Sequence, residues 1–225
     1  MLGVISLLNT KTMGASTLLD TSDPDKFITF SGRIGFNTSN RTFPSGYYNV
    51  WNHDSWGTGF DIGALVNLNF KEYLSIQPGI FFETRSGYFT YLTEYLDFYS
   101  NKQDYYEMGS RSSCNITIPV VGVVKLNLVE NVKVLAELGP YFQFNLADKG
   151  QNNLTVLYRM PQSNVYDHYT AKHNSIDVGI KIGGGLQFFD HYYLGVHYLA
   201  GACNAWKRPE GGRNKGWMFT IGYDL

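Results

Sequence analysis

The ionisable residues of this sequence recur at alternate positions of strand-like runs, on the side opposite the apolar residues. Asp61, for example, lies between Phe60 and Ile62. Alternate residues of a strand share a face, so the charges gather on one side of each run. Because the set is nearly balanced in sign, we expect its members to form ion pairs and hydrogen bonds with one another. This predicted charge network consists of Arg33, Asp61, Glu83, Lys125, Glu137, Asp177, Lys181, His197 and Asp224.

Residues that could support catalysis lack the motifs that such chemistry needs. No G-x-S-x-G elbow is present, and Gly183-Gly184-Gly185 continues as strand instead of opening a helix. We therefore expect no enzyme, no metal site and no cofactor. A hydrolase or acyltransferase with its site among the loops stays open as an alternative, and its candidate residues are His53, Asp54, Ser55, Ser112, Ser113 and His173.

Eight strand-like runs position these side chains. Each run is long enough to cross the hydrocarbon of a bilayer at a tilt, which takes about 9–11 residues. The predicted strands are Phe27–Asn37, Gly59–Phe70, Leu74–Thr84, Asn115–Leu128, Val132–Phe144, Ser175–Phe188, Tyr192–Ala202 and Gly216–Leu225.

The connections between these runs alternate between short and long. The short ones are Lys71–Tyr73, Val129–Asn131 and Phe189–His191, and the long ones are Thr38–Thr58, Arg85–Cys114, Ala147–Asn174 and Cys203–Lys215, which we expect to be loops. This alternation is typical of a bacterial outer-membrane β-barrel, with short periplasmic turns and long extracellular loops. The sequence therefore predicts an all-β, eight-stranded, antiparallel up-and-down transmembrane barrel.

The composition favours a barrel with its apolar faces turned to lipid. Charged residues make up 16% of the chain, against about 25% in soluble proteins. A lysine or arginine facing lipid at mid-bilayer costs about 2–4 kcal/mol, so the charges should lie inside. An eight-stranded barrel is just wide enough for its own side chains, which predicts a plugged polar lumen. The net charge of −1 argues against a nucleic-acid partner.

Aromatic residues are concentrated near the strand ends and in the long connections. At the strand ends we expect two interfacial girdles: Tyr73, Phe188, Phe189, Tyr192, Tyr193 and Tyr223 at the short turns, and Phe36, Phe60, Tyr141 and Phe144 at the other end. In the connections, exposed aromatic side chains could bind a protein or a glycan. Alternatively, these segments are strand extensions with their aromatic side chains packed between hairpins. The residues of this predicted binding surface are Trp51, Trp56, Tyr88, Tyr91, Tyr105 and Trp206.

The first 20 residues are expected to be a leader, followed by the barrel domain over residues 21–225. Met1–Leu8 is apolar and Met13-Gly14-Ala15 resembles a cleavage site, but no basic residue precedes the apolar run. We interpret Met1–Ala15 as a signal peptide truncated at its start, with a short disordered leader as the alternative.

Several stretches of the chain also resemble a known family. They read GFDIGALVNLNFKEYLSIQPGIFF, ITIPVVGVVKLNL, LAELGPYFQF, DVGIKIGGGLQFFDHYYLGVHYLAGACN and FTIGYDL. The set is similar to the PorT-like outer-membrane β-barrel family of Bacteroidetes, over Phe27–Leu225. The resemblance implies an eight-stranded outer-membrane barrel and no particular activity. The chain ends in Leu225, where many such barrels end in Phe.

The resulting hypothesis is a small, non-enzymatic barrel of the bacterial outer membrane with a structural or surface-interaction role. Its expected partners are outer-membrane lipid, the barrel-assembly machinery during insertion, and a surface protein or glycan that binds the loops. A soluble lipocalin-like barrel with an apolar ligand is the alternative of another class, and it requires the apolar faces to point inward.

Overall fold

The computed structural model describes residues 18–42, 52–96, 102–156, 175–204 and 213–225. For the far ends of several strands it describes the backbone alone. The described strands are β1 (Ile28–Thr42), β2 (Asn52–Asp54), β3 (Gly57–Lys71), β4 (Leu74–Leu96), β5 (Lys102–Val129), β6 (Val132–Val156), β7 (Ile176–Phe188), β8 (Tyr192–Asn204) and β9 (Arg213–Asp224).

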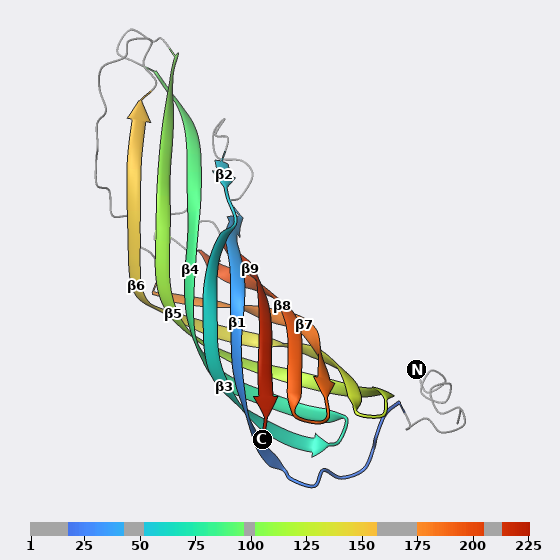
Figure 1. Ribbon diagram of the computed structural model, residues 1–225. Coiled ribbons are helices and arrows are strands. Elements are labelled where there is room, and N and C mark those ends of the chain that lie inside the picture. Colours follow the sequence, from blue (N-terminus) through green and yellow to red (C-terminus); the bar gives the residue numbers. More distant parts are fainter. Residues whose placement is uncertain (1–17, 43–51, 97–101, 157–174, 205–212) are drawn as a thin grey trace.

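Eight of these strands close into one antiparallel barrel (Figure 1). Each strand pairs with its neighbours along the chain, and β1 pairs with β9 from Ser31↔Asp224 to Thr42↔Arg213, which joins the two ends of the sheet. The short β2 lies outside this ring and pairs only with β4 among the described strands. The predicted eight-stranded antiparallel barrel is thereby confirmed.

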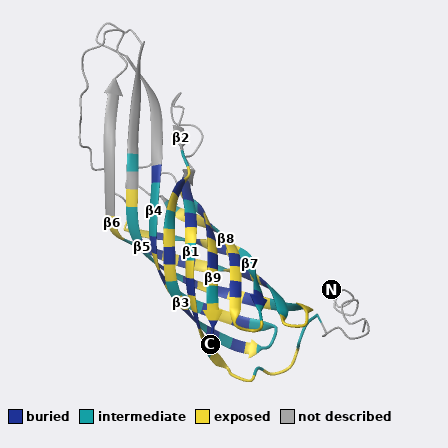
Figure 2. Cartoon of the chain, viewed as in Figure 1, coloured by how far each residue is buried: buried dark blue, intermediate teal, exposed yellow. Residues whose placement is uncertain are grey.

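The barrel forms because its strands alternate between large apolar residues and small or polar residues. Outward side chains such as Phe60 and Ile62 are about half exposed, at 50% and 51%, whereas Asp61 between them is fully buried. Figure 2 shows the result as alternating exposed and buried bands along the strands of the barrel. The period of two therefore separates an apolar outer face from a buried inner face.

Tight turns join the strands at one end of the barrel, called the turn end here. Glu130 and Asn131 connect β5 to β6, and the backbone of Asn131 has a φ of 64°. Phe189 and Asp190 in the β7–β8 turn have φ of 52° and 62°. Two successive positive φ values match the twist of a hairpin, although this backbone conformation is uncommon for phenylalanine.

Three strands continue far beyond the other end of the barrel (Figure 1). β4 and β5 stay paired up to Leu96↔Lys102, and β5 and β6 up to Tyr105↔Val156. The expectation of a loop over Arg85–Cys114 is wrong, and the first part of the connection Ala147–Asn174 is also strand. These tyrosine-rich stretches have high strand propensity but no apolar alternation, because no strand face there has to meet lipid. We call β4 from Gly87, β5 up to Arg111 and β6 from Gly150 the raised sheet.

At the turn end, Leu18–Phe27 runs along the turns before β1 begins, and we call it the lead-in segment. The Leu18 carbonyl accepts a hydrogen bond from Asn127 N at 2.9 Å, and the Ser22 carbonyl accepts one from Glu72 N at 3.2 Å. The Ser22 hydroxyl and N–H both donate to Asp20, which lowers the pKa of that carboxyl. The signal peptide expected at Met1–Ala15 lies outside the described residues.

Candidate functional site

Eight of the nine residues of the predicted charge network lie inside the barrel, each at most 8% exposed. The ninth, Lys125, is half-buried near the turn end. The nine side chains do not form a single cluster. Six of them fall into two groups, with Arg33, Glu137, His197 and Asp224 near the turn end and Asp61 and Glu83 nearer the raised sheet. The buried Lys181 interacts electrostatically with carboxylates of both groups, and Asp177 accepts a hydrogen bond from Asn214 Nδ2 at 3.0 Å. The two groups differ in how completely their polar atoms are paired.

The group near the turn end is built around Glu137. The Tyr193 hydroxyl donates to Glu137 Oε1 at 2.5 Å, and His197 Nε2 lies 2.8 Å from Glu137 Oε2. The Tyr193 hydroxyl also lies 3.1 Å from His197 Nε2, so the three side chains form a closed triangle. All three are buried, and β6 and β8 supply them.

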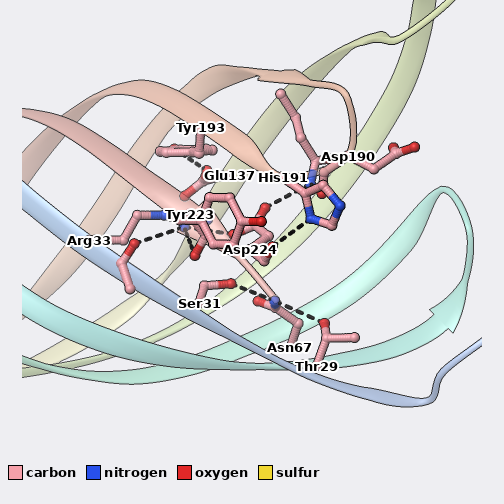
Figure 3. Close-up of polar contacts among 12 residues, drawn as sticks. Thr29, Ser31, Arg33, Asn67, Glu137, Asp190, His191, Tyr193, Tyr223 and Asp224 are labelled. Carbon is pink, nitrogen blue, oxygen red and sulfur yellow. Dashed lines mark hydrogen bonds and ion pairs between the residues drawn. The ribbon is translucent and has the colours of Figure 1, made fainter.

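Arg33 and Asp224 continue this group across the seam between β1 and β9. Arg33 Nη1 lies 2.6 Å from Asp224 Oδ1, and Gln187 Nε2 donates to Asp224 Oδ2 at 2.7 Å. The guanidinium of Arg33 also lies 4.1 Å from the ring centroid of Tyr193. Figure 3 shows Arg33 directed toward Asp224 and Tyr193 directed toward Glu137. We call these six residues the lower network: Arg33, Glu137, Gln187, Tyr193, His197 and Asp224.

Glycines on the inner face make room for the lower network. A Cβ on Gly195 would lie 2.2 Å from the Tyr193 hydroxyl, and a Cβ on Gly222 would lie 2.3 Å from Arg33 Cδ. Tyr193 and Arg33 can therefore lie flat across the wall of the barrel only because these positions carry no side chain. Tyr193 was expected in the outer girdle, and this expectation is wrong. It falls on the inner face, where a buried tyrosine needs a hydrogen-bond partner for its hydroxyl.

Nearer the raised sheet, two carboxyl groups face each other in the lumen. Asp61 of β3 and Glu83 of β4 are direct partners in the strand register, and both are buried. Glu83 Oε2 forms an ion pair with Arg85 Nη2 at 2.8 Å. The same oxygen accepts a long hydrogen bond from Gln143 Nε2 at 3.4 Å. Neither carboxyl oxygen of Asp61 has a hydrogen-bond partner in the described part of the chain. We call Asp61 and Glu83 the upper pair.

Arg85 is the residue at this level that sequence reasoning missed. It was assigned to a loop, because the apolar alternation fades after Thr84. β4 continues through it, and the odd-numbered positions of β4 keep pointing inward, so Arg85 reaches Glu83. The continuing parity of the strand was the signal that could have identified it.

Large apolar side chains share the lumen with the charges, which differs from the expected plug of paired charges. Val121, Val123, Leu135 and Tyr193 form one buried cluster, and Tyr141, Leu199 and Met218 form another. Tyr141 was expected in the outer girdle, but it is 0% exposed inside the barrel. Its ring lies against Gly179, where a Cβ would come within 2.6 Å of it. The lumen is filled by apolar and polar layers together.

A pocket of about 290 Å³ lies between the lower network and the lead-in segment. Lys133 on its wall pairs with Asp190 at 2.7 Å and with Glu72 at 3.7 Å. The other residues that line the pocket carry both positive and negative side chains. They include Lys125, Asp224 and the lead-in residues Asp25 and Lys26. With mixed charges that already pair across the walls, the pocket forms the turn end of the lumen and selects no single ligand charge.

The outer surface of the barrel is a belt of large apolar side chains. Its members include Ile34, Ile80, Leu138, Ile180 and Phe219, each between 44% and 57% exposed. The charges lie inside and the apolar faces outside, so the lipocalin-like alternative, which needs the opposite arrangement, is contradicted.

Part of the aromatic binding surface and half of the hydrolase candidates lie outside the described side chains. The candidates Ser55, Ser112 and Ser113 are described, and the Ser113 hydroxyl accepts a hydrogen bond from Asn115 Nδ2 at 3.2 Å. Trp56 is 46% exposed next to the start of β3. Tyr88, Tyr91 and Tyr105 belong to strands of the raised sheet, as the alternative of strand extensions expected, but their side chains are not described. The remaining residues outside the described side chains are Trp51, Trp206, His53, Asp54 and His173.

The described residues show no group of side chains able to hold a metal ion. Cys114 and Cys203 are both free thiols. His197 Nδ1 has no hydrogen-bond partner among the described residues, and no serine or cysteine completes a nucleophile–base pair with it there. No helix among the described residues is long and apolar enough to span a membrane.

Comparisons with known proteins show which family the chain belongs to. A comparison with curated proteins finds no match. Similar solved structures include Ail of Yersinia pestis, with 15% identity, 89% of this chain and 100% of that chain covered, and a TM-score of 0.42. OprG of Pseudomonas aeruginosa is another, with 9% identity, coverage of 92% and 99%, and a TM-score of 0.42. The family described as outer membrane protein beta-barrel domain matches residues 19–201, and this chain therefore belongs to that family and is a small β-barrel of the bacterial outer membrane.

Proposed function

We propose that this protein is a non-catalytic, non-conducting membrane anchor that presents the raised sheet at the cell surface as an interaction surface. The observation that carries the proposal is the length of β4, β5 and β6. Their pairing continues from Gly87↔Arg111 to Leu96↔Lys102, well beyond the point where β6 and β7 part at Phe144↔Ile176. A barrel whose only role is to span the membrane has no need of this extension.

The position of the termini supports the orientation. Both ends of the described chain lie at the turn end (Figure 1), which faces the periplasm in barrels of this type. The raised sheet then projects outward from the cell. Three paired strands form a firmer platform than a loop, because every inner backbone group has a partner.

The filled lumen supports the absence of conduction and of catalysis. The lower network and the apolar cluster around Val123 and Leu135 occupy the cross-section near the turn end. The buried His197–Glu137 pair has a hydrogen-bonding role within this layer, and no described serine or cysteine hydrogen-bonds to it. Membership in the PorT-like group in particular stays a prediction from the residues.

The test removes the β4–β5 part of the raised sheet and keeps the barrel. Gly87 and Arg111 are register partners, so a two-residue turn can join them after deletion of residues 88–110. Wild-type and shortened proteins in nanodiscs are then compared on an array of defined glycans and purified surface proteins. We expect the shortened protein to keep a folded barrel, seen as a band that shifts on heating in SDS gel electrophoresis. Its affinity for any ligand that wild type binds should fall at least tenfold. Equal binding by both proteins would show that the β4–β5 part of the raised sheet is not the interaction surface.

A conductance measurement tests the closed lumen separately. In planar bilayers we expect no stable channels from wild-type protein. Large, long-lived conductance steps would contradict the non-conducting anchor, whatever the outcome of the binding comparison.

A further inference from the structure

The outward face of β9 changes character in a fixed order along the strand. From the turn end it carries Tyr223, Ile221, Phe219 and Trp217, all 43–57% exposed. The next two outward positions are Lys215 and Arg213. The register between β1 and β9 runs without interruption through this stretch, so both cations stay on the outer face. A strand that passes from apolar residues to tryptophan to cations follows the profile of a bilayer from hydrocarbon through interface to headgroups.

Aromatic residues mark the height of the interface beside these cations. The rings of Tyr198 and Trp217 lie 4.9 Å apart on neighbouring strands β8 and β9. Lys215 Nζ lies 5.7 Å from the ring centroid of Trp56, which precedes β3. The ammonium group therefore lies beside an aromatic ring at the end of the apolar belt that is farther from the turns.

The described neighbours of Lys215 on the adjoining strands carry no charge: its register partners are Asn40 of β1 and Ala200 of β8. Among the described residues, no carboxylate forms an ion pair with Arg213 or Lys215. Two neighbouring outward positions of one strand are about 7 Å apart, so the two cations can engage one anionic headgroup together.

We propose that Arg213 and Lys215, with Trp56 and Trp217 beside them, bind a phosphate-bearing lipid of the outer leaflet. Arginine binds phosphate oxygens through two parallel N–H groups, and lysine adds a point charge. The tryptophans contact the glycerol or sugar region below the phosphate. A lipid is the occupant that this geometry favours, because the cations stand directly above a lipid-facing apolar strip. The site fixes one lipid contact on one side of the barrel.

The test compares a double variant with a matched control. The variant R213Q/K215Q neutralises both cationic side chains of the site. The control K26Q/K71Q neutralises two lysines at the turn end, and the control R213K/K215R keeps both charges at the site. Purified proteins in neutral detergent are titrated with lipid A, a diphosphorylated glycolipid, and bound lipid is counted by native mass spectrometry. One basic residue near an anionic surface contributes roughly fivefold, so R213Q/K215Q should bind roughly thirtyfold more weakly. The other two variants should bind within threefold of wild type.

Three results would overturn the proposal. The first is wild-type affinity in R213Q/K215Q while the protein keeps its heat-modifiable barrel. The second is an equal loss in K26Q/K71Q, which would mean that the net charge of the protein governs binding. The third is displacement of the lipid by millimolar inorganic phosphate, which would make the site a general anion site. Phosphatidylcholine, which is zwitterionic, should not compete.

Discussion

The lower network and the upper pair occupy the same lumen but differ in how their buried charged side chains are paired. In the lower network, Glu137 receives two short hydrogen-bond contacts and Asp224 pairs with Arg33 and Gln187. In the upper pair, Glu83 shares Arg85, and Asp61 has no hydrogen-bond partner in the described chain. A buried polar group is costly when unpaired and mildly stabilising when paired. We infer that the lower network holds the barrel together and that the upper pair does not.

The largest expected effect comes from removing the centre of the lower network. Glu137→Ala leaves the Tyr193 hydroxyl and the His197 ring without their shared acceptor. Leaving a buried hydrogen-bonding group without its partner costs about 1–3 kcal/mol, and because two groups lose their acceptor we expect the free energy of unfolding to fall by about 2–6 kcal/mol. Urea unfolding in lipid vesicles, followed by tryptophan fluorescence, measures it. A loss below about 1 kcal/mol would show that the network contributes little.

The next effect tests the packing that positions the network. Gly195→Val places a side chain where Tyr193 now lies, and overpacking of this kind costs about 1–3 kcal/mol. Gly32→Val is the matched control, because a Cβ on Gly32 meets no atom within 4 Å. We expect the control to unfold like wild type in the same assay. Similar losses in both variants would mean that strand glycines matter for their backbone and not for the space they leave.

A smaller effect is expected at the upper pair. Asp61→Asn removes the repulsion between two facing carboxyl groups without removing a hydrogen bond seen in the structure. We expect the free energy of unfolding to stay within about 1 kcal/mol of wild type or to rise, since like charges directly opposite each other destabilise a strand pair. A clear loss of stability would place Asp61 in a network as necessary as the lower one.

The smallest effect is expected outside the lumen. Lys71 Nζ pairs with Asp23 of the lead-in segment at 2.6 Å, but both groups are exposed. Surface ion pairs contribute little and are screened by salt. Lys71→Ala should therefore leave the unfolding transition unchanged at physiological salt. A shift of the transition that disappears at high salt would show that the pair does anchor the lead-in segment.

The alternation of residues was enough to predict the barrel and the inner face of each strand. Asp61, Glu137 and His197 were assigned inward from their parity alone, and they lie inside. The partners of these residues could not be predicted, because which inward side chains meet depends on the stagger between strands. Tyr193 shows the difficulty: its type suggested the interface, and only the neighbouring Gly195 and Glu137 explain its place in the lumen.

The raised sheet could not be predicted from the sequence for a different reason. The apolar alternation of β4 ends near Thr84, where the strand leaves the belt, and beyond it no burial pattern distinguishes a strand from a loop. Arg85 was missed for that reason. Pairing between β4 and β5 continues through backbone hydrogen bonds, which leave no periodic trace in the sequence.

The seam between β1 and β9 sets the order in which the barrel can assemble. Arg33 and Tyr223, which meet across it, are 190 positions apart in the chain, whereas the hairpins β3–β4, β5–β6 and β7–β8 close over turns of two or three residues. Local pairings form faster than distant ones. We therefore expect the three hairpins to form before the β1–β9 seam closes, so that the Arg33–Asp224 ion pair across the seam forms last.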